Sequence, residues 1–494
     1  MGIFDFLKKK DETKKIKKRT YAGARGGRLF SDFIQSSFSA DSQLRYNLEV
    51  LRNRSRELVR DNEFARRYVN LMKTNIVGDK GFHLQVKATN DDGTLDAPGN
   101  TIIENAFKSW GRLGNPTVDG RLSWLDCQKY AIETLVRDGE VFIKKLSGRR
   151  YKDNFAIQLI EPDMIDEKKN ELLSNGNQIR MGVELDKFHK PVAYHVLTTH
   201  PGDKHYSRQV AQKHIRVPAE EMIHVFMPSR TYQTRGEPFM ASVISSLKML
   251  GAYREAEIIA ARISASKMGM LTTPNSDDYM GDDLHENFQP IIDVEPGSFH
   301  QLPAGYDIKM FDPDRPNTSF GEFEGAILKG IASGLNVSYA ALSSDLSSVN
   351  YSSIRQGALD ERDHYRALQQ FLIQHFVEPI FQNWLMSSMD FGSIPLPSSK
   401  YDKFNDNIVF RGRGWNWIDP LKEINASVVG LQNGILSHQD VQAHYGRDVE
   451  ETFSQIAKDK QIATQNGLSM AFEPFGQKFP VEAEITQGDD NGKV

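Results

Sequence analysis

"PFMASVISSLKMLGAYREAEIIAARISASKM", residues 238–268, carries the clearest long helical pattern in the chain. Pro238 suits the first turn of a helix, where a missing backbone N–H costs nothing. Apolar residues then recur every three or four positions, at Met240, Val243, Leu247 and Leu250. Beyond Gly251 the pattern becomes rich in alanine, whose small side chain lets a neighbouring helix approach closely. Roughly 30 helical residues span about 45 Å, so this stretch predicts a long rod.

The residues that follow predict a small excursion and a return. Residues 270–316 are rich in turn-forming and acidic residues, with short strand patterns such as "GSFHQL" and "DIKMF". Residues 317–342 then contain a second helical pattern, "SFGEFEGAILKGIASGL". The order is helix, small β-rich segment, helix.

A run of short polar side chains, residues 343–353, separates this second helix from a third. It contains Ser343, Ser344, Asp345, Ser347, Ser348, Asn350, Tyr351, Ser352 and Ser353. The third helical pattern reaches about Ser388, and we expect a kink at Pro379, because proline lacks the backbone donor and clashes one turn back. From residue 419 onward, glycine-punctuated patterns predict two or three short helices.

The chain before the long helix predicts an α+β region over residues 29–237. A helical pattern runs from Asp41, a plausible N-cap, to Ile76, with Gly78 as the stop. Two more helices and several strands follow without a regular βαβ rhythm, which argues against a doubly wound sheet. Residues 1–28 are strongly basic and read either as a solvated flexible arm or as an arm that binds nucleic acid or a partner. Residues 481–494 read as a flexible acidic tail.

Composition sets limits on the class of protein. The chain has 494 residues, 39% of them hydrophobic, and a net charge of −4, which suit a globular protein of several domains. A single cysteine excludes an intramolecular disulfide framework, no apolar run is long enough to predict a membrane span, and the N-terminus does not follow the order of a signal peptide. We therefore expect a soluble intracellular protein. The pI of about 6.4 is well below the value of roughly 9 expected of a domain that grips nucleic acid, so any contact with nucleic acid should be loose.

The sequence contains no pattern that predicts a catalytic residue, a set of metal ligands or a cofactor site. Phosphate-binding loops and nucleophile elbows are absent from the sequence. His200 and His205 lack an evident carboxylate or cysteine cluster, and His364, His375, His438 and His444 form no HExxH pattern. Cys127, within an amphipathic pattern, reads as a buried thiol. Asp312 and Asp314 in "FDPDRP" leave one alternative open, a metal-dependent hydrolase or nuclease.

Several stretches together resemble the lambda-type portal proteins of tailed bacteriophages or a related prophage. They are "NIVGDKGFHLQV" at 75–86, "IQLIEPDMID" at 157–166, the block at 217–266, the block at 334–385, and "DPLKEINASVVGLQNGILSHQDVQAHYGRDVEE" at 419–451. The resemblance extends from about residue 20 to residue 470.

The resemblance implies a portal fold with a mixed α/β wing. Its parts would be the wing at 29–237 and 354–418, two stem helices at 238–269 and 317–342, a β-rich clip at 270–316, a tunnel loop at 343–353 and a helical crown at 419–480. The polar residues of 343–353 become candidates for facing DNA. Arg355, Arg362 and Arg366, which follow that loop, become candidates for DNA contacts or for salt bridges between subunits. Candidates for close stem packing are Leu247, Leu250, Ala256, Ala260, Gly325, Gly330 and Gly334.

The resemblance also implies a function and partners. The chain would be a portal vertex protein of the virion, a homo-oligomeric ring that is dodecameric in the particle and assembles in the host cytoplasm. It would nucleate head assembly with major capsid or scaffold proteins and pass double-stranded DNA without sequence specificity during packaging and ejection. The large terminase subunit, and later head-completion or adaptor proteins, would dock at the clip. It would not be an enzyme and would contact no membrane. A structural capsid protein that binds DNA through the basic arm is a further alternative.

Overall fold

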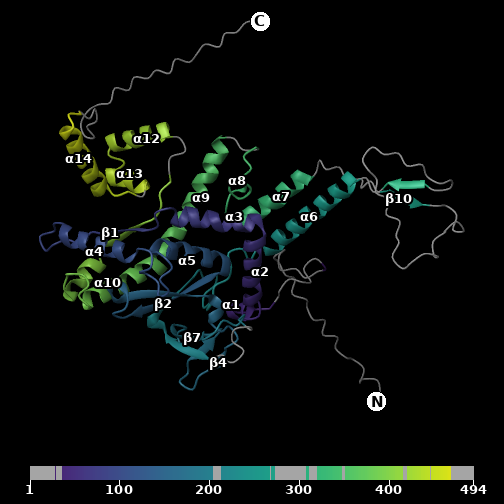
Figure 1. Cartoon of the computed structure of the whole chain (residues 1–494), viewed down its shortest axis with the longest axis horizontal. Helices are drawn as coiled ribbons and strands as arrows, with labels where there is room; N and C mark the ends of the chain where they lie inside the picture. Colours follow the sequence, from purple (N-terminus) through teal and green to yellow (C-terminus); the bar gives the residue numbers. More distant parts are fainter. Residues whose placement is uncertain are drawn as a thin grey trace, which may run out of the picture.

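The computed structural model describes residue 28 and residues 36–203, 213–266, 269–272, 307–310, 320–347, 351–415, 420–445 and 447–468. The fold is α+β, as predicted, because every pair of neighbouring strands is antiparallel. A mixed body carries a two-helix projection on one side and a group of C-terminal helices above it (Figure 1). Among the described residues, no helix is both long enough and apolar enough to cross a membrane.

The N-terminal helical region is interrupted rather than continuous. It consists of α1 (Ala40–Leu44), α2 (Leu48–Asp61), α3 (Glu63–Met72) and a π-helical turn, η3 (Lys73–Val77). Gly78 ends the run with a φ of 72°, as predicted. The predicted N-cap is wrong: Ser39 caps α1, whereas Asp41 lies inside it and its carboxylate accepts hydrogen bonds from the backbone N–H and hydroxyl of Thr234. The Asp41 carboxylate, which the local sequence predicts as a helix cap, is therefore occupied by a tertiary hydrogen bond to Thr234.

Two sheets form the lower part of the body. The three-stranded sheet has the order β3-β2-β9 and the five-stranded sheet the order β4-β5-β6-β7-β8. Their bounds are β2 (Glu140–Ser147), β3 (Phe155–Ile160), β9 (Met222–Phe226), β4 (Glu171–Leu172), β5 (Gln178–Arg180), β6 (Val183–Leu185), β7 (Pro191–Leu197) and β8 (His214–Pro218). Short 3-10 turns, η4 (Lys152–Asn154), η5 (Pro162–Met164) and η6 (Ala219–Glu221), connect them. A separate pair joins β1 (His83–Val86) to β12 (Ile408–Arg411), so the two halves of the predicted wing meet in one sheet.

The main core lies between the three-stranded sheet and the helices α4 (Ala97–Trp110), α5 (Trp124–Asp138) and α10 (Glu378–Asp390), whereas the five-stranded sheet buries a separate apolar cluster together with Phe142 and Met222. Aromatic rings dominate its centre: Phe107 stacks on Trp110 with centroids 5.4 Å apart and meets Trp384 edge-on at 4.9 Å. Aromatic pairs of this kind add about 0.5–1.5 kcal/mol beyond area burial. Segments separated by about 280 residues thus share one core, and the two wing segments expected from the sequence fold as one body.

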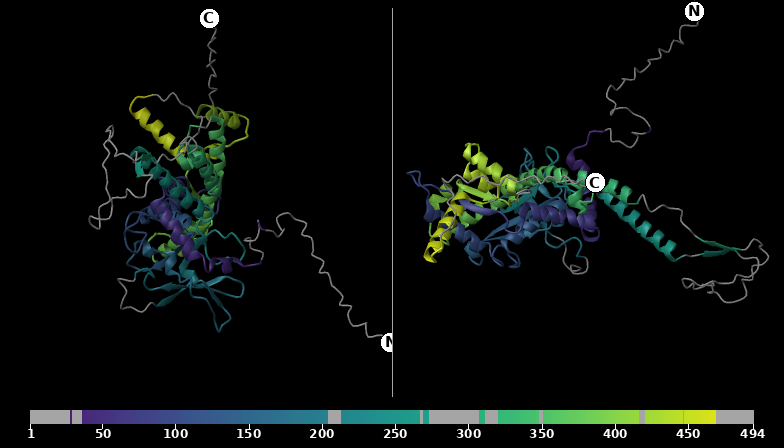
Figure 2. Two further views of the ribbon diagram at one scale, coloured as in Figure 1. Left: turned by 90° about the vertical axis from the view of Figure 1, so that its right-hand side faces the viewer. Right: turned by 90° about the horizontal axis from the view of Figure 1, so that it is seen from above.

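The long helix α6 (Ile244–Ser266) and α7 (Phe320–Gly334) lie side by side and project from the body (Figures 1 and 2). We call them the stem helices. The paired strands β10 (Gly269–Thr272) and β11 (Asp307–Met310) follow at their far end, and the rest of the predicted β-rich segment lies outside the described residues. The predicted order of helix, strands and helix is therefore present.

The start of α6 differs from the prediction. Residues 238–243 form tight turns instead of helix, with the N–H of Ala241 donating to the Pro238 carbonyl and that of Val243 to the Met240 carbonyl. The N–H of Phe239 donates to the carbonyl of Val136 at the end of α5. This contact holds the chain against α5, and the helix begins at Ile244, about 1.7 turns later than predicted.

The third long helix is continuous in sequence but changes its hydrogen bonding before the proline. α9 (Tyr351–Leu372) passes into a π-helical turn, η9 (Ile373–Val377), and then into α10, with Pro379 in the first turn of α10. The hydrogen bonding therefore changes in the turn before Pro379, whose missing donor falls in the first turn of α10, and the kink expected there stays a prediction.

The C-terminal region is helical, as predicted. After η10 (Ser398–Lys400), α11 (Tyr401–Asn405) and β12, it contains α12 (Pro420–Gln432), α13 (His438–His444) and α14 (Val449–Gln465). We call α12, α13 and α14 the C-terminal helices. The predicted crown extends to residue 480, but residues 469–480, most of the basic arm and the acidic tail lie outside the described residues.

Candidate functional site

The stem helices are joined along one face. In α6, Leu247 and Leu250 are buried, and Tyr253 stacks on Phe320 of α7 with centroids 5.7 Å apart. Nε of Arg254 lies 3.3 Å from the Glu324 carboxylate. The predicted apolar stripe of α6 therefore packs within this chain, against α7 and the body.

The opposite face of α6 is also apolar but is exposed. Met249, Ala252, Ala256 and Ile259 follow one another at spacings of three or four residues and so share one face. The side chain of Met249 is 72% exposed and that of Ile259 is 48% exposed. A helix with apolar residues on two faces is normally covered on both, so this outer face is a candidate interface.

The predicted stem-packing residues fall into two groups. Leu247, Leu250 and Gly334 make close contacts within the chain; a Cβ on Gly334 would lie 2.6 Å from Cγ1 of Val243. Gly325 is the weaker case, because a Cβ there would only reach the Tyr339 hydroxyl at 3.8 Å. Nothing lies within 4 Å of a Cβ on Gly330, and Ala256 and Ala260 are exposed or half-buried.

The polar segment between α7 and α9 is shorter than predicted. A short helix, α8 (Tyr339–Ser343), ends at Ser343, and α9 begins at Tyr351. Tyr351, Ser352 and Ser353 are therefore the first residues of a helix and not loop residues. Serine is compatible with a helix start because its hydroxyl can accept from the free N–H groups there.

The described part of the loop is a compact turn centred on Asp345. Oδ1 of Asp345 accepts hydrogen bonds from the backbone N–H of Ser347 at 2.9 Å and from its hydroxyl at 2.6 Å. Oδ2 accepts from the Tyr339 hydroxyl at 3.1 Å. Ser344 adopts the left-handed conformation, with a φ of 60°. Ser348 and Asn350 lie outside the described residues.

The three arginines that follow the loop are placed differently from one another. The side chain of Arg355 lies outside the described set. Burial lowers the pKa of Arg362, while the nearby Glu423 of α12 opposes that effect. Arg366 donates to Asp363 at 2.8 Å and lies over the ring of Trp415 at 5.6 Å. Arg366 is thus engaged within the chain, and neither predicted role, in DNA contact or in salt bridges between subunits, is tested by these contacts.

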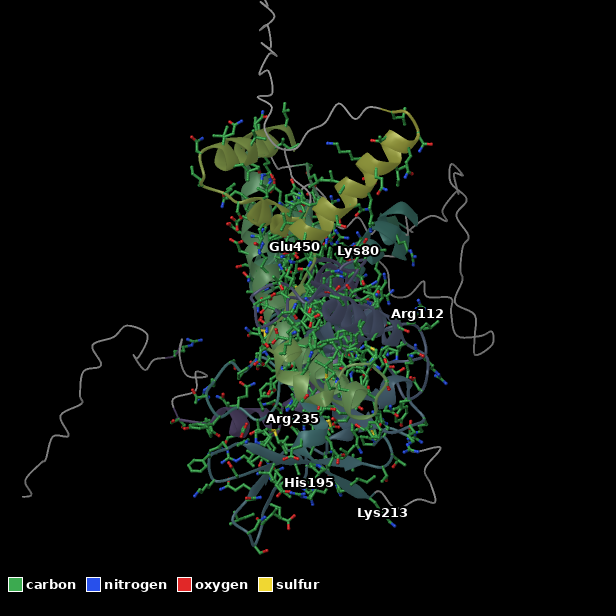
Figure 3. The ribbon with its side chains drawn as sticks, turned by 90° about the vertical axis from the view of Figure 1, so that its left-hand side faces the viewer. Lys80, Arg112, His195, Lys213, Arg235 and Glu450 are labelled. Carbon is green, nitrogen blue, oxygen red and sulfur yellow. The ribbon has the colours of Figure 1, made fainter. Side chains whose placement is uncertain are left out.

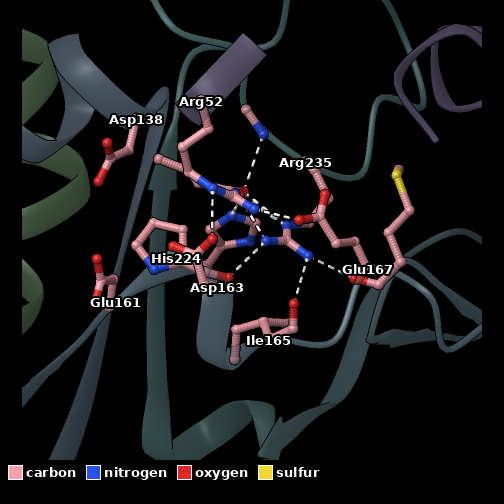
Figure 4. Close-up of polar contacts among 12 residues, drawn as sticks. Arg52, Asp138, Glu161, Asp163, Ile165, Glu167, His224 and Arg235 are labelled. Atoms are coloured by element: carbon pink, nitrogen blue, oxygen red, sulfur yellow. Dashed lines mark hydrogen bonds and ion pairs between the residues drawn. The ribbon is translucent and has the colours of Figure 1, made fainter. Parts of the chain in front are cut away.

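A buried ion-pair network at the root of the stem was missed by the sequence analysis (Figure 4). Arg235, just before the stem, donates to both carboxylate oxygens of Glu140 in β2 at 2.7–2.9 Å. Arg52 of α2 lies 3.5 Å from the same carboxylate, and Nε2 of His224 in β9 lies 3.0 Å from it. Figure 3 shows Arg235 among the packed side chains of the body, above the sheet that carries His195.

The two arginines of this network stabilise the ionised form of the buried Glu140 carboxylate. Burial would raise the pKa of Glu140, but Arg235 and His224 outweigh it and hold that pKa well below its ordinary range. Burial lowers the pKa of His224, which favours the neutral imidazole. Arg235 also donates to the backbone carbonyls of Pro162 and Met181. The network is structural: it fixes α2, two strands and the stem root to one another. No periodic pattern marks it, because its members come from four distant segments.

One group of residues has the composition of a metal site but not its chemistry. Glu161, Asp163 and His200 place possible ligand atoms within 4.8 Å of one another, so the expectation that His200 has no carboxylate neighbours is wrong. Arg56 already lies 3.1 Å from Glu161 and 2.6 Å from Asp163. Nδ1 of His200 accepts from the N–H of Gly202 at 3.0 Å, so the neutral ring carries its proton on Nε2, the nitrogen facing Glu161. Binding of a metal ion at Nε2 would require the other tautomer, whose protonated Nδ1 could no longer accept from Gly202.

The remaining candidates for chemistry give no catalytic arrangement among the described residues. Cys127 is buried, as predicted, and burial raises its pKa to about 12, so its thiolate is not formed at neutral pH. Nδ1 of His375 lies 3.0 Å from the Phe371 carbonyl, one turn back on the same helix. Asp312, Asp314 and His205 lie outside the described residues.

Comparisons with known proteins show the family to which the chain belongs. The model of the family "Phage portal protein, lambda family" matches residues 26–369. The probable portal protein of Halomonas phage phiHAP-1 is 34% identical over 93% of this chain and 90% of that protein. The portal protein of Escherichia phage N15 is 25% identical over 91% of this chain and 92% of that protein, and portal protein B of Escherichia phage lambda is 23% identical over 91% of each.

The family model and the sequence relatives together define a phage portal protein, a class of structural proteins of the virion. This chain belongs to the lambda family of phage portal proteins. Among solved structures, a chain from the neck of a native gene transfer agent particle has a TM-score of 0.42 and 12% identity, covering 80% of this chain and 93% of that one. An HK97-family phage portal protein from Corynebacterium diphtheriae has a TM-score of 0.31 and 11% identity, covering 75% of this chain and 96% of that one.

Proposed function

We propose that the chain is the repeating subunit of a homo-oligomeric ring, dodecameric in the particle, whose central channel passes double-stranded DNA during packaging and ejection. The supporting observation is the exposed apolar face of α6, opposite the face that packs on α7. In a ring, a face of one subunit meets a different face of its neighbour. Covering Met249 and Ile259 in this way contributes about 1.5–3 kcal/mol for each fully buried side chain, repeated at every contact around the ring.

The charge of the chain fits a conduit better than a tight DNA-binding surface. Duplex DNA carries about one phosphate charge per 1.7 Å of its axis, so a strongly basic lining would hold it in place. The net charge of −4 avoids this. Short polar side chains of the segment 343–353 would contact the phosphates without reading bases. The DNA contact is accordingly independent of sequence.

Partners follow from the family. We propose that the ring nucleates head assembly with major capsid or scaffold proteins. The large terminase subunit, and later head-completion or adaptor proteins, would dock on residues 270–316 at the far end of the stem. The chain would assemble in the host cytoplasm and remain in the virion. It would hydrolyse nothing itself.

Electron microscopy of the purified full chain tests the ring. Class averages should show closed rings with an axial opening wide enough for a duplex, about 20 Å or more as judged from the dimensions of B-DNA grooves. A chain that stays monomeric in all conditions, or a closed assembly without an opening, contradicts the proposal. A nuclease assay with Mg²⁺ or Mn²⁺ tests the hydrolase alternative: cleavage that Asp312→Ala abolishes would favour it.

A further inference from the structure

The turn after α8 is held by a set of contacts that reaches into the body. Helix α8 itself is fixed at both ends: the N–H of Ser338, its N-cap residue, donates to the Glu361 carboxylate of α9, and Nε of Arg67 in α3 donates to the Ala341 carbonyl at 3.1 Å. Leu342 is buried in the main core. The point from which the loop leaves the body is therefore tied to two other helices.

Within the turn, both carboxylate oxygens of Asp345 are in use. Ser347 donates twice to Oδ1, and the Tyr339 hydroxyl donates to Oδ2. The N–H of Asp345 donates to Oγ of Ser343 at 3.1 Å, and that hydroxyl donates to the Tyr339 carbonyl at 2.7 Å. Every polar group of Asp345 named here faces the protein, so none of them is directed to a ligand.

Two further observations separate Asp345 from the serines around it. A carboxylate repels phosphate, whereas a hydroxyl can donate to it. Ser344 is held in the left-handed conformation, which a non-glycine residue adopts only where its surroundings fix it. The N–H of Ser344 donates to the Ala340 carbonyl at 2.9 Å, so the turn geometry is enforced on both sides of it.

We infer that Asp345 is a positioning residue that fixes the direction in which the loop leaves α8, and that it does not itself contact DNA. The inference rests on the proposed function, because it assigns a role within the segment proposed to face DNA. It reassigns one predicted DNA-facing residue and gives Tyr339, which the sequence analysis did not single out, a role as its partner.

Three substitutions distinguish a positioning role of Asp345 from an effect of its negative charge on DNA. Asp345→Asn removes the negative charge but keeps an oxygen that can accept from Ser347. Asp345→Ala removes both the charge and the acceptors. Tyr339→Phe removes one donor and leaves the carboxylate intact. If Asp345 acts by position, the asparagine variant resembles the parent and the alanine variant does not; if it acts by charge toward DNA, the two variants behave alike.

The measurement uses full-chain rings with a spin label at Leu346→Cys. Leu346 is 61% exposed and takes no part in the hydrogen bonds of the turn, and the native Cys127 is buried and inert to labelling. Pulsed EPR then gives the distribution of distances between labels in one ring. One hydrogen bond is worth about a fivefold change in the ordered fraction, so Tyr339→Phe should broaden the distribution moderately and Asp345→Ala strongly. Equal, narrow distributions in the parent and Asp345→Ala would overturn the inference.

A packaging assay distinguishes this inference from the proposed function. Replacing residues 343–353 by a short glycine linker should reduce the amount of DNA packaged or retained. If that replacement has no effect while Asp345→Ala still broadens the distances, the DNA role fails and the positioning role stands. If the replacement impairs packaging and Asp345→Ala changes neither packaging nor distances, the positioning role fails and the DNA role stands.

Discussion

At the scale of single residues, the closest approach between the stem helix α7 and the segment leading into α6 depends on a glycine. A Cβ on Gly334 would lie 2.6 Å from Cγ1 of Val243, far inside ordinary contact distance. Gly334→Ala should therefore destabilise the chain by about 1–3 kcal/mol, the usual range for overpacking. Urea unfolding of the dilute chain measures this change.

Gly330, one turn earlier on α7, is the matched control. Nothing lies within 4 Å of a Cβ there, so Gly330→Ala should stabilise the chain by about 0.5–1 kcal/mol through helix propensity alone. Equal effects of the two substitutions would show that the contact between Gly334 and Val243 is not a stability determinant.

The buried histidine of the network predicts a pH dependence. Burial lowers the pKa of His224 in the folded chain, so the unfolded chain binds the proton first as the pH falls. The free energy of unfolding therefore keeps the full contribution of His224 above the unfolded pKa of about 6.5. Below that pH it decreases, by up to about 1.4 kcal/mol per pH unit for one site. Urea unfolding at several pH values between 7.5 and 5.5 should show this slope.

His195 and His364 also have pKa values lowered by burial and add to the same slope. Substitution His224→Gln should therefore reduce the slope without removing it. An unchanged slope in His224→Gln would place the effect in the other two histidines. Most Asp and Glu residues contribute in a lower pH range. Burial raises the pKa of Glu167, however, so this carboxylate contributes a slope of the opposite sign.

At the scale of elements, α6 presents one covered and one uncovered apolar face, and the uncovered one is open to a direct test. Met249→Asp and Ile259→Asp each put a charge on that face, and a charge that must be desolvated at an interface is strongly unfavourable. We expect the fold to persist, because both side chains are exposed in the single chain, while ring formation measured by light scattering and electron microscopy is lost.

The control makes the same chemical change elsewhere. Leu172 of β4 is 72% exposed on the five-stranded sheet, so Leu172→Asp introduces an aspartate at an equally exposed apolar position away from the stem. Rings that survive both stem substitutions, or that Leu172→Asp disrupts equally, would exclude the outer face of α6 as the subunit contact.

Helices and strands could be predicted where the sequence pattern that determines them lies within the element itself. The apolar stripe from Met240 to Leu250, the strands of the wing and the stop at Gly78 follow from spacing and from glycine. The start of α6 did not follow, because a contact from Phe239 to the end of α5 overrides the helical pattern. The same holds for Asp41, whose carboxylate is taken by Thr234, and for the Arg235 network, whose members are brought together only by tertiary structure.

At the scale of the whole molecule, a buried carboxylate joins the start of α14 to the body. Asp448, just before α14, lies 3.3 Å from Arg411 of β12 and 3.4 Å from Lys87, and its Oδ1 accepts from the N–H of Glu450 at 2.8 Å. Its side chain is almost fully buried. Arg411 also donates to the Arg447 carbonyl at 2.7 Å, so the contact clamps the start of α14 to the sheet that joins the two halves of the body.

Removal of that carboxylate should loosen the C-terminal helices without unfolding the body. Loss of one partner from a buried ion pair costs about 3–5 kcal/mol, because it leaves Arg411 uncompensated. In Asp448→Ala, hydrogen exchange followed by mass spectrometry should therefore accelerate in α13 and α14 and stay unchanged in α10, whose packing is in the main core. Asp459→Ala, an exposed position on α14, should change neither. Exchange that rises equally in α10 would mean that the C-terminal helices and the body unfold as one unit, and the local role of Asp448 would then be wrong.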